Sequence, residues 1–208
     1  MSKYEFTVNW FDHTARPLWT RMIPDIAPRR CLEIGSYEGA SACFLIDALA
    51  PRHPIELHCV DTWEGGREHR ARGEDMAAVE RRFDANIATA IAAAGNPVQF
   101  RKHKGPASRH LPRLISEESL SGYFDFVYVD GSHEAADVLF DGVLGFELLS
   151  VGGTMVFDDY IWNPGDPRTS DPLGRPKPAI DALTGILARK IRIVGSPNLQ
   201  MVLRRIAP

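Results

Sequence analysis

Aspartate residues directly follow two apolar, strand-like runs in this sequence. The run at residues 124–129 is followed by Asp130. The run at residues 154–157 is followed by the pair Asp158 and Asp159. In an open α/β sheet the ligand site lies at the carboxyl ends of the strands, so neighbouring strands would bring these carboxylates together. Oxygen-rich clusters suit a hard divalent cation, and the pattern therefore predicts a Mg²⁺-type site.

A histidine three residues after the first of these aspartates is a candidate for proton transfer. An imidazole titrates near neutral pH, so His133 could accept a proton from an acceptor hydroxyl. It could instead bind the metal, or cap the helix that its neighbours Ser132 and Glu134 begin. The sequence leaves these three roles of the histidine open. Likewise, the acidic pair taken alone could be a polar turn after a buried strand.

A glycine-containing turn near the start of the chain lies between a predicted strand and a predicted helix. Gly35 lets the backbone turn sharply, and Gly39 permits close approach at the helix start. A dinucleotide fingerprint would need further glycines where the chain has Tyr37 and Ala40. The turn therefore favours a smaller amino-acid moiety over a pyrophosphate, with Glu33 setting the loop or meeting an ammonium group.

An acidic residue ends the second predicted strand. Asp61 is placed where a carboxylate can accept hydrogen bonds from both hydroxyls of a ribose, although a strand-end aspartate is often only a turn former. Trp63 follows two residues later and offers either a flat face for an adenine or an ordinary core side chain. Both interpretations of the tryptophan stay open.

Alternating strand and helix patterns position these residues. The alternation predicts a parallel sheet with right-handed crossovers, closed by a C-terminal hairpin. The expected strands are residues 31–34, 56–60, a strand beginning at 98, 124–129, 154–157, 191–194 and 199–203. The expected helices are residues 40–50, 75–94, 109–115, 135–149 and 179–189.

Two segments stand outside this alternation. Residues 1–29 carry Trp10, Phe11 and Trp19 and are expected to form a helical addition that packs over the core or against a partner. Residues 163–178 are rich in proline and glycine and follow the acidic pair, which is typical of a lid-like loop but also of a surface excursion. The remaining residues, 30–208, read as a single domain.

Length, charge and cysteine content exclude several classes of protein. At 208 residues, with 44% hydrophobic and 25% charged residues, the chain is ordinary for a globular domain. A net charge of −3 gives no reason to expect a nucleic acid partner, and no apolar run approaches a bilayer span. We see no secretory signal, and the odd set of Cys31, Cys43 and Cys59 fits a reduced, cytoplasmic setting without zinc.

Two motifs carry a resemblance to a known family. The segment from Glu33 to Ser41 resembles the first motif of class I S-adenosylmethionine-dependent methyltransferases, particularly the catechol O-methyltransferase-like group. The segment Asp61-Thr62-Trp63-Glu64-Gly65 resembles the second-strand motif of a branch that includes sugar O-methyltransferases of macrolide and aminocoumarin biosynthesis. The resemblance runs over residues 30–160. It implies an α/β fold, a doubly wound, mostly parallel seven-stranded Rossmann-like sheet with helices on both faces.

The resemblance implies S-adenosyl-L-methionine as cofactor and assigns its contacts. The methionine part would lie on the glycine turn, the ribose on the second strand end, and the adenine beside Gly105. Many relatives have an acidic or hydroxyl residue after that glycine, whereas this chain has Pro106 and Ala107. The expected cofactor contacts are Glu33, Gly35, Ser36, Tyr37, Gly39, Ser41, Asp61, Thr62, Trp63, Gly105, Ala107, Ser108 and Asp130.

In the same families the strand-end acids bind a divalent cation, and Asp130, Asp158 and Asp159 match those positions. His133 stands where the catechol enzymes have a lysine base. The resemblance thus implies a cation-dependent O-methyltransferase for a small hydroxylated metabolite, a sugar or a phenol. The alternatives are a metal-independent methyltransferase, a nucleotide-dependent oxidoreductase that the tyrosine in the turn disfavours, and a catalytically silent cofactor-binding subunit. The aromatic N-terminal segment could support a homo-oligomer.

Overall fold

Seven strands form one sheet in the computed structural model, which describes residues 3–163, 165, 171–197 and 199–208. The strands are β1 (Arg30–Ile34), β2 (Ile55–Asp61), β3 (Val98–Lys104), β4 (Phe124–Val129), β5 (Leu149–Phe157), β6 (Ile191–Gly195) and β7 (Met201–Arg205). Their order across the sheet is β3-β2-β1-β4-β5-β7-β6. Strand β7 runs antiparallel to both of its neighbours, and the other pairs are parallel. The expected mostly parallel sheet with a C-terminal antiparallel hairpin is confirmed.

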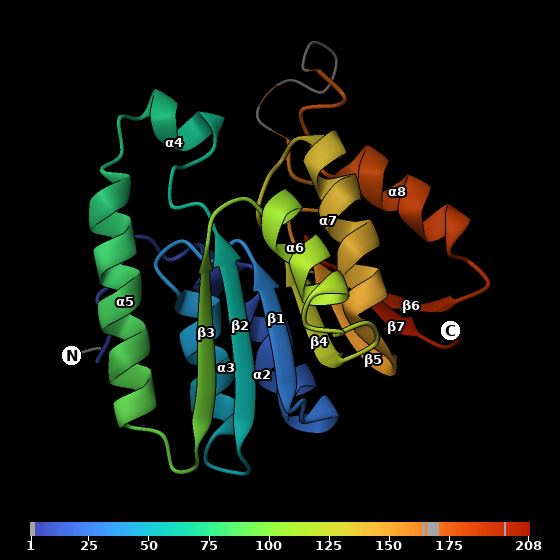
Figure 1. Cartoon of the computed structure of the whole chain (residues 1–208). Coiled ribbons are helices and arrows are strands. Elements are labelled where there is room, and N and C mark those ends of the chain that lie inside the picture. The colour runs from blue at the N-terminus through green and yellow to red at the C-terminus, as the bar shows by residue number, and fades with distance from the viewer. Residues whose placement is uncertain (1–2, 164, 166–170, 198) are drawn as a thin grey trace.

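Helices cover both faces of the sheet (Figure 1). They are α1 (Trp10–His13), α2 (Arg16–Ile26), α3 (Ala40–Leu49), α4 (Arg67–Ala71), α5 (Met76–Ala92), α6 (Ala107–Ser116), α7 (Ala135–Leu148) and α8 (Lys177–Ile186). Helices α2, α3 and α5 pack in one apolar layer, and α6, α7 and α8 pack in the other. The fold is therefore a sheet between two helical layers.

Side-chain alternation along the central strands supplies both layers. In β4, Phe126 and Tyr128 belong to the layer of α2 and α3, whereas Val127 and Val129 belong to the layer of α7 and α8. Successive side chains of a strand point to opposite faces, so a strand covered on both sides must be apolar throughout. This is why residues 126–129 of β4 read as a continuous apolar run that is followed by a charged residue.

The N-terminal segment is part of the core. Trp19 of α2 is fully buried, with its ring 5.2 Å from that of Phe126 and 4.7 Å from that of Tyr128. Phe11 packs edge-on against Trp19 at 5.3 Å. Of the two placements expected for this segment, the structure has the one over the core. Only Trp10 of the three aromatic residues is substantially exposed.

The lid-like loop is described only in part. Residues 164 and 166–170 lie outside the described residues, so the lid interpretation stays a prediction. After the loop, α8 begins at Lys177, two residues earlier than expected. Strand β5 begins at Leu149 and includes the glycine pair that was expected to precede it, with an irregularity in its register with β4.

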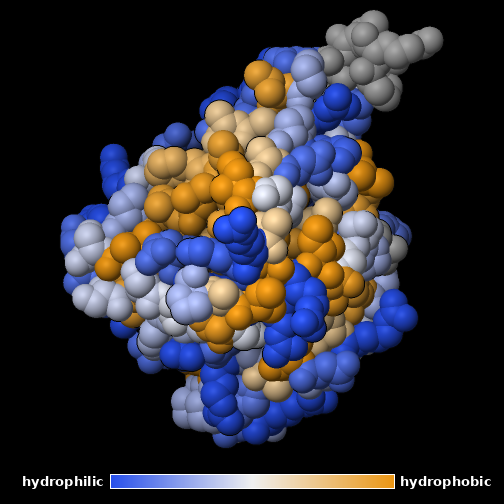
Figure 2. Space-filling view, turned by 90° about the vertical axis from the view of Figure 1, so that its right-hand side faces the viewer, coloured by the Kyte–Doolittle hydropathy of each residue, from blue (hydrophilic) through white to orange (hydrophobic). Residues whose placement is uncertain are grey.

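Apolar side chains gather on the face that carries α7, α8 and the β6 edge (Figure 2). The large apolar side chains exposed on these elements are Leu139, Phe140, Val143, Ile186, Ile193 and Val194. None of the described helices combines the length and the apolar character that crossing a membrane requires. The expected homo-oligomer stays a prediction, and two of the three aromatic residues proposed to support it are buried within this chain.

Candidate active site

The carboxyl edge of the sheet brings the predicted acidic residues together. Strands β4 and β5 are neighbours, with Val129 paired to Phe157, so Asp130 and Asp158 follow side by side. The backbone N–H of Asp158 donates to the carbonyl of Val129 at 3.0 Å. Asp159 then adopts a left-handed φ of 54°, which turns the chain away from the sheet.

A buried tyrosine hydroxyl lies between two of these carboxyl groups. Tyr128 Oη is 3.0 Å from Oδ2 of Asp130 and is also hydrogen-bonded to Oδ2 of Asp158. A phenol has one proton to donate, and ionised carboxylates only accept. One of the two contacts therefore needs a proton on a carboxyl group. The carboxyl groups of Asp130 and Asp158 together therefore carry fewer than two negative charges.

Burial and mutual repulsion explain where that proton can lie. Burial, reinforced by the charge of Asp159, raises the pKa of Asp158 to about 6. Burial and the charges of Asp158 and Asp159 raise the pKa of Asp130 well above its ordinary value. Asp130 is exposed to solvent as a residue, although many protein atoms lie close to its carboxyl group. A bound cation would offset this repulsion.

The donor chemistry of the acidic residues fits a hard divalent cation. Asp130 and Asp159 each use one carboxylate oxygen for a hydrogen bond within the described chain, and their Oδ1 atoms accept none there. Oδ1 of Asp158 accepts only the N–H of Asp159, at 2.8 Å. Each residue thus keeps a lone pair for an ion. As they lie here, however, no three acidic, histidine or cysteine side chains of the described residues converge as a ready-made ligand set.

The predicted histidine joins this cluster through Asp159. Nε2 of His133 lies 2.9 Å from Oδ2 of Asp159, and the ring of Trp162 stacks on the imidazole at 3.9 Å. Because an ionised carboxylate only accepts, this contact assigns a proton to Nε2. Helix α7 begins at Ala135 with Glu134 as its N-cap, so the histidine does not cap it.

The carboxylate of Asp61 organises the glycine turn. Its Oδ2 accepts the backbone N–H groups of Ser36 at 2.8 Å and Tyr37 at 3.0 Å. Its Oδ1 accepts the N–H of Trp63 at 2.7 Å. These bonds join the ends of β1 and β2, and Oδ1 keeps a lone pair. The ribose contact expected of this residue stays a prediction.

Gly35 connects the turn to the acidic cluster. Its φ is +87°, and a Cβ at this position would lie 2.1 Å from the carbonyl oxygen of Asp130. Only glycine allows the two strand ends to approach this closely. At the other end of the turn, Gly39 has a φ of 82° and caps α3, whose N-terminal N–H groups point toward the turn.

Two polar atoms behind the turn have no hydrogen-bond partner among the described residues. They are Oε2 of Glu33 and Oγ of Ser36, both buried. Burial raises the pKa of Glu33 to about 7. Ser41, also buried, lies in the first turn of α3. Buried oxygen atoms without a hydrogen-bond partner fit the ammonium group of a bound amino-acid moiety, which could donate to them. The residues of this turn predict such a moiety.

The residues expected around the adenine have mixed surroundings. Trp63 is 4% exposed and its ring lies 4.7 Å from that of Phe83, so the structure has the core-packing interpretation of this side chain. Its Nε1–H donates to the carbonyl of Tyr37 at 2.9 Å, which supports the turn. Oγ1 of Thr62 accepts the N–H of Glu64.

The third strand end lies beside the second. The N–H of Gly105 donates to the carbonyl of Asp61 at 2.8 Å, so the two ends are adjacent. Pro106 is the N-cap of α6, and Ala107 and Ser108 form its first turn. The structure thus places Gly105, Ala107 and Ser108 at the sheet edge that carries the rest of the predicted site.

Sequence reasoning missed several residues that hold this site. Tyr128 lies two residues before Asp130, and this spacing places both on one face of a strand, a signal that was present in the sequence. Gln200 donates to Asp158 and accepts from Trp19, and no local pattern announces either contact. Glu38, 2% exposed, accepts hydrogen bonds from the backbone and hydroxyl of Thr7 and ties the N-terminal segment to the turn.

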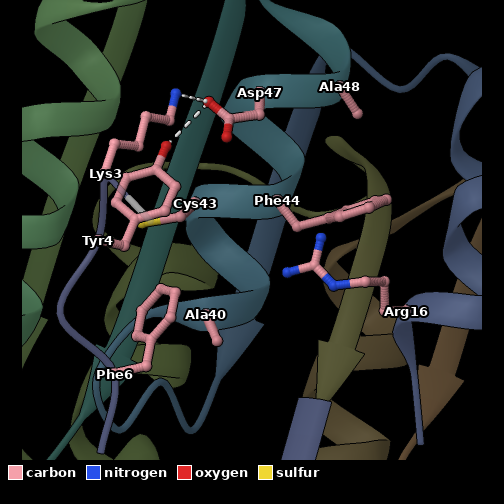
Figure 3. Close-up of a pocket in the computed structure, with 9 residues that line it drawn as sticks. All are labelled: Lys3, Tyr4, Phe6, Arg16, Ala40, Cys43, Phe44, Asp47 and Ala48. Atoms are coloured by element: carbon pink, nitrogen blue, oxygen red, sulfur yellow. Dashed lines mark hydrogen bonds and ion pairs between the residues drawn. The ribbon is translucent and has the colours of Figure 1, made fainter. Parts of the chain in front are cut away.

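One pocket lies away from these residues (Figure 3). It holds about 400 Å³ between the N-terminal segment, α2 and the outer face of α3. Lys3 and Tyr4 both bond to Asp47 across it. None of the predicted site residues lines it. The charged side chains of the pocket are partly paired with one another, and they add no chemical group that the candidate site lacks.

A family model described as a methyltransferase domain matches residues 32–160, more than half of the chain. The chain belongs to this methyltransferase family. The match confirms the resemblance carried by the glycine turn and the second strand end. This methyltransferase is 30% identical over 142 residues to caffeoyl-CoA O-methyltransferase 1 of Zea mays, which is 68% of this chain and 47% of the maize protein. The chain thus spans about half the length of this curated relative.

Solved methyltransferases share the fold. The O-methyltransferase TomG of Streptomyces achromogenes, solved with S-adenosylmethionine, matches with a TM-score of 0.62 at 20% identity, over 92% of this chain and 78% of its own. MycE of the mycinamycin biosynthetic pathway, solved with Mg and S-adenosylhomocysteine, matches with a TM-score of 0.57 at 22% identity, over 99% of this chain and 52% of its own. At these identities the likeness concerns the fold.

Proposed function

We propose that this protein is an S-adenosylmethionine-dependent O-methyltransferase that uses a divalent cation to methylate a hydroxyl group of a small metabolite, a phenol or a sugar. The observation that carries the proposal is the position of Asp130, Asp158 and Asp159 at the ends of the adjacent strands β4 and β5, directly beside the turn that Gly35 closes. Family membership and the cofactors named for TomG and MycE support it.

When bound, the cofactor supplies an electrophilic methyl group, and the cation lowers the pKa of the acceptor hydroxyl. The residues of this chain then have distinct tasks. The three aspartates hold the cation and orient the acceptor oxygen. The turn and Asp61 would hold the cofactor and orient it, since methyl transfer depends mainly on proximity and alignment. His133 would take the hydroxyl proton, while Asp159 holds its ring through the contact at Nε2.

A metal-independent methyltransferase is the second candidate. It draws on the observation that the described acidic side chains do not converge as a ligand set. In that case Asp130 and Asp159 would orient the acceptor by hydrogen bonds alone, and the histidine would be the sole base.

Chelation separates the two candidates. We expect EDTA to abolish turnover of a panel of phenols and sugars, and Asp158→Ala to do the same, while S-adenosylhomocysteine affinity measured by calorimetry changes less than about twofold, because the turn that holds it stays intact. Asp84→Ala, which removes an exposed carboxylate on α5 that pairs with Lys102, is the matched control and should leave turnover unchanged.

Turnover that survives both EDTA and Asp158→Ala would favour the metal-independent enzyme. Cofactor binding without methylation of any hydroxyl acceptor, with or without Mg²⁺, would instead indicate a catalytically silent subunit.

A further inference from the structure

Trp19, Gln200 and Asp158 form a buried chain of hydrogen bonds from the N-terminal helix to the sheet edge. Nε1–H of Trp19 donates to Oε1 of Gln200 at 3.1 Å, and Nε2–H of Gln200 donates to Oδ2 of Asp158 at 3.2 Å. The tryptophan and the glutamine are 0% exposed, and the aspartate is 8% exposed. Three distant segments, α2, the residue before β7 and the residue after β5, thus meet at one carboxylate.

The chemistry of the two outer groups fixes the orientation of the amide. An indole N–H can only donate, and an ionised carboxylate can only accept. The amide of Gln200 satisfies both only when its oxygen faces Trp19 and its NH₂ faces Asp158. Without the indole donor the amide could turn its oxygen toward the carboxylate, which would be repulsive.

The chain also fixes the rotation of the carboxylate. Oδ2 of Asp158 accepts from Gln200 and is also hydrogen-bonded to the Tyr128 hydroxyl, so it has two buried partners. Oδ1 accepts only the N–H of Asp159 and keeps one lone pair. Because Oδ2 is held by buried donors, Oδ1 is the oxygen left to face an ion.

We propose that Gln200 is a positioning residue for the divalent cation. It holds Asp158 with Oδ1 directed to the ion, and Trp19 keeps the glutamine amide in the donating orientation. The proposal rests on the proposed function, in which Asp158 is a ligand. It assigns the N-terminal segment a part in the site from within the core.

The test is the affinity of the full chain for Mn²⁺, measured by the electron paramagnetic resonance signal of the free ion. Gln200→Met keeps the volume and removes the donor, and should weaken Mn²⁺ binding about tenfold, as is usual for groups that orient metal ligands. Trp19→Phe keeps a ring in the core and removes the N–H, and should weaken binding about two- to fivefold. Affinity for S-adenosylhomocysteine should stay within about twofold in both variants, which a general loosening of the fold would not allow.

Two further variants calibrate the result. Asp158→Asn measures the loss of the ligand itself. Asn86→Leu removes another buried amide, 2% exposed, whose bonds run to Glu5 and to the backbone of Glu38. It should lower the melting temperature and leave Mn²⁺ affinity unchanged.

If Asp158→Asn weakens Mn²⁺ binding while Gln200→Met and Trp19→Phe do not, the positioning role is overturned and the proposed function stands. If Asp158→Asn has no effect, the metal part of the proposed function fails and the positioning role fails with it. Should Gln200→Met not fold, as judged by near-ultraviolet circular dichroism, Trp19→Phe decides the question alone.

Discussion

Gly35 shows how strictly a single position can be determined at this site. A side chain there would meet the carbonyl oxygen of Asp130 at 2.1 Å, and backbone atoms cannot give way as a flexible side chain can. Gly73 has a similar left-handed φ of +66°, but no atom lies within 4 Å of its added Cβ. The two glycines therefore share a left-handed backbone conformation but differ in the space available for a side chain.

We expect Gly35→Ala to prevent folding or to cost more than about 4 kcal/mol, because it combines backbone strain with a backbone clash. Gly73→Ala should cost only the conformational part, about 1–2 kcal/mol. Urea unfolding of both variants measures the difference. Equal losses would mean that the close approach of the two strand ends does not constrain the residue.

At the residue scale the sequence predicted the ionisable groups of the site but not the residues that hydrogen-bond to them and hold them in place. Asp130, Asp158 and Asp159 could be found because strand ends are visible in the apolar pattern. Tyr128 could have been found from its spacing to Asp130. Gln200 could not, because its partner lies far away in the chain and the contact depends on tertiary pairing.

Among the elements, the N-terminal segment and the glycine turn are joined by one buried carboxylate. Glu38 accepts from the N–H of Thr7 at 2.6 Å, from its hydroxyl at 2.7 Å and from Nε of Arg82 at 2.5 Å. The segment, the turn and α5 are thereby connected at a point next to the proposed cofactor site. The Arg82 pair is largely shielded from solvent, so it is worth more than a surface pair.

We expect Glu38→Gln to loosen both ends of this connection, since an amide offers only one acceptor oxygen. The amide of Thr7 should exchange its hydrogen at least about tenfold faster, and S-adenosylhomocysteine should bind more weakly. Hydrogen exchange by mass spectrometry and calorimetry measure the two effects. Glu134→Gln, at an exposed ion pair with Arg67, is the control. Unchanged cofactor affinity in Glu38→Gln would show that the segment does not support the turn.

The predicted elements match the structure where packing is local. Strands β1, β2 and β4 are largely buried on both faces, so their apolar runs stand out in the sequence, as do Asp61 at the end of β2 and Asp130 after β4. Helix α5 ends at Ala92, two residues before the expected end at residue 94. The partner of β7 was not predicted, because the sequence shows a hairpin but not which strand the hairpin joins.

At the scale of the whole molecule, a buried acid on α7 sets how stability responds to pH. Burial, with a smaller contribution from the charge of Asp137, raises the pKa of Asp141 to about 7. The folded state therefore favours the protonated form relative to the unfolded chain, where an aspartate titrates near 4. The favourable difference is present at low pH and is lost as pH rises through about 7.

We expect Asp141→Asn to be more stable than the parent at pH 8, by about 2–4 kcal/mol, and nearly equal to it at pH 4, because each pKa unit is worth about 1.4 kcal/mol. Glu147→Gln, an exposed acid on the same helix, is the control and should change little. Urea unfolding at the two pH values measures the difference. A constant offset between Asp141→Asn and the parent at both values would contradict the assignment.

The position of β7 inside the sheet affects the order in which the molecule can be completed during synthesis. It is the last strand in sequence, yet it lies between β5 and β6 and pairs with the strand that leads into Asp158. A chain emerging from the ribosome exposes its N-terminal part first. Until residues 201–205 leave the exit tunnel, β5 is an open edge, prone to pair with another chain. Premature termination just before β7 should therefore yield an aggregating product, even though the glycine turn and the three aspartates have already been made.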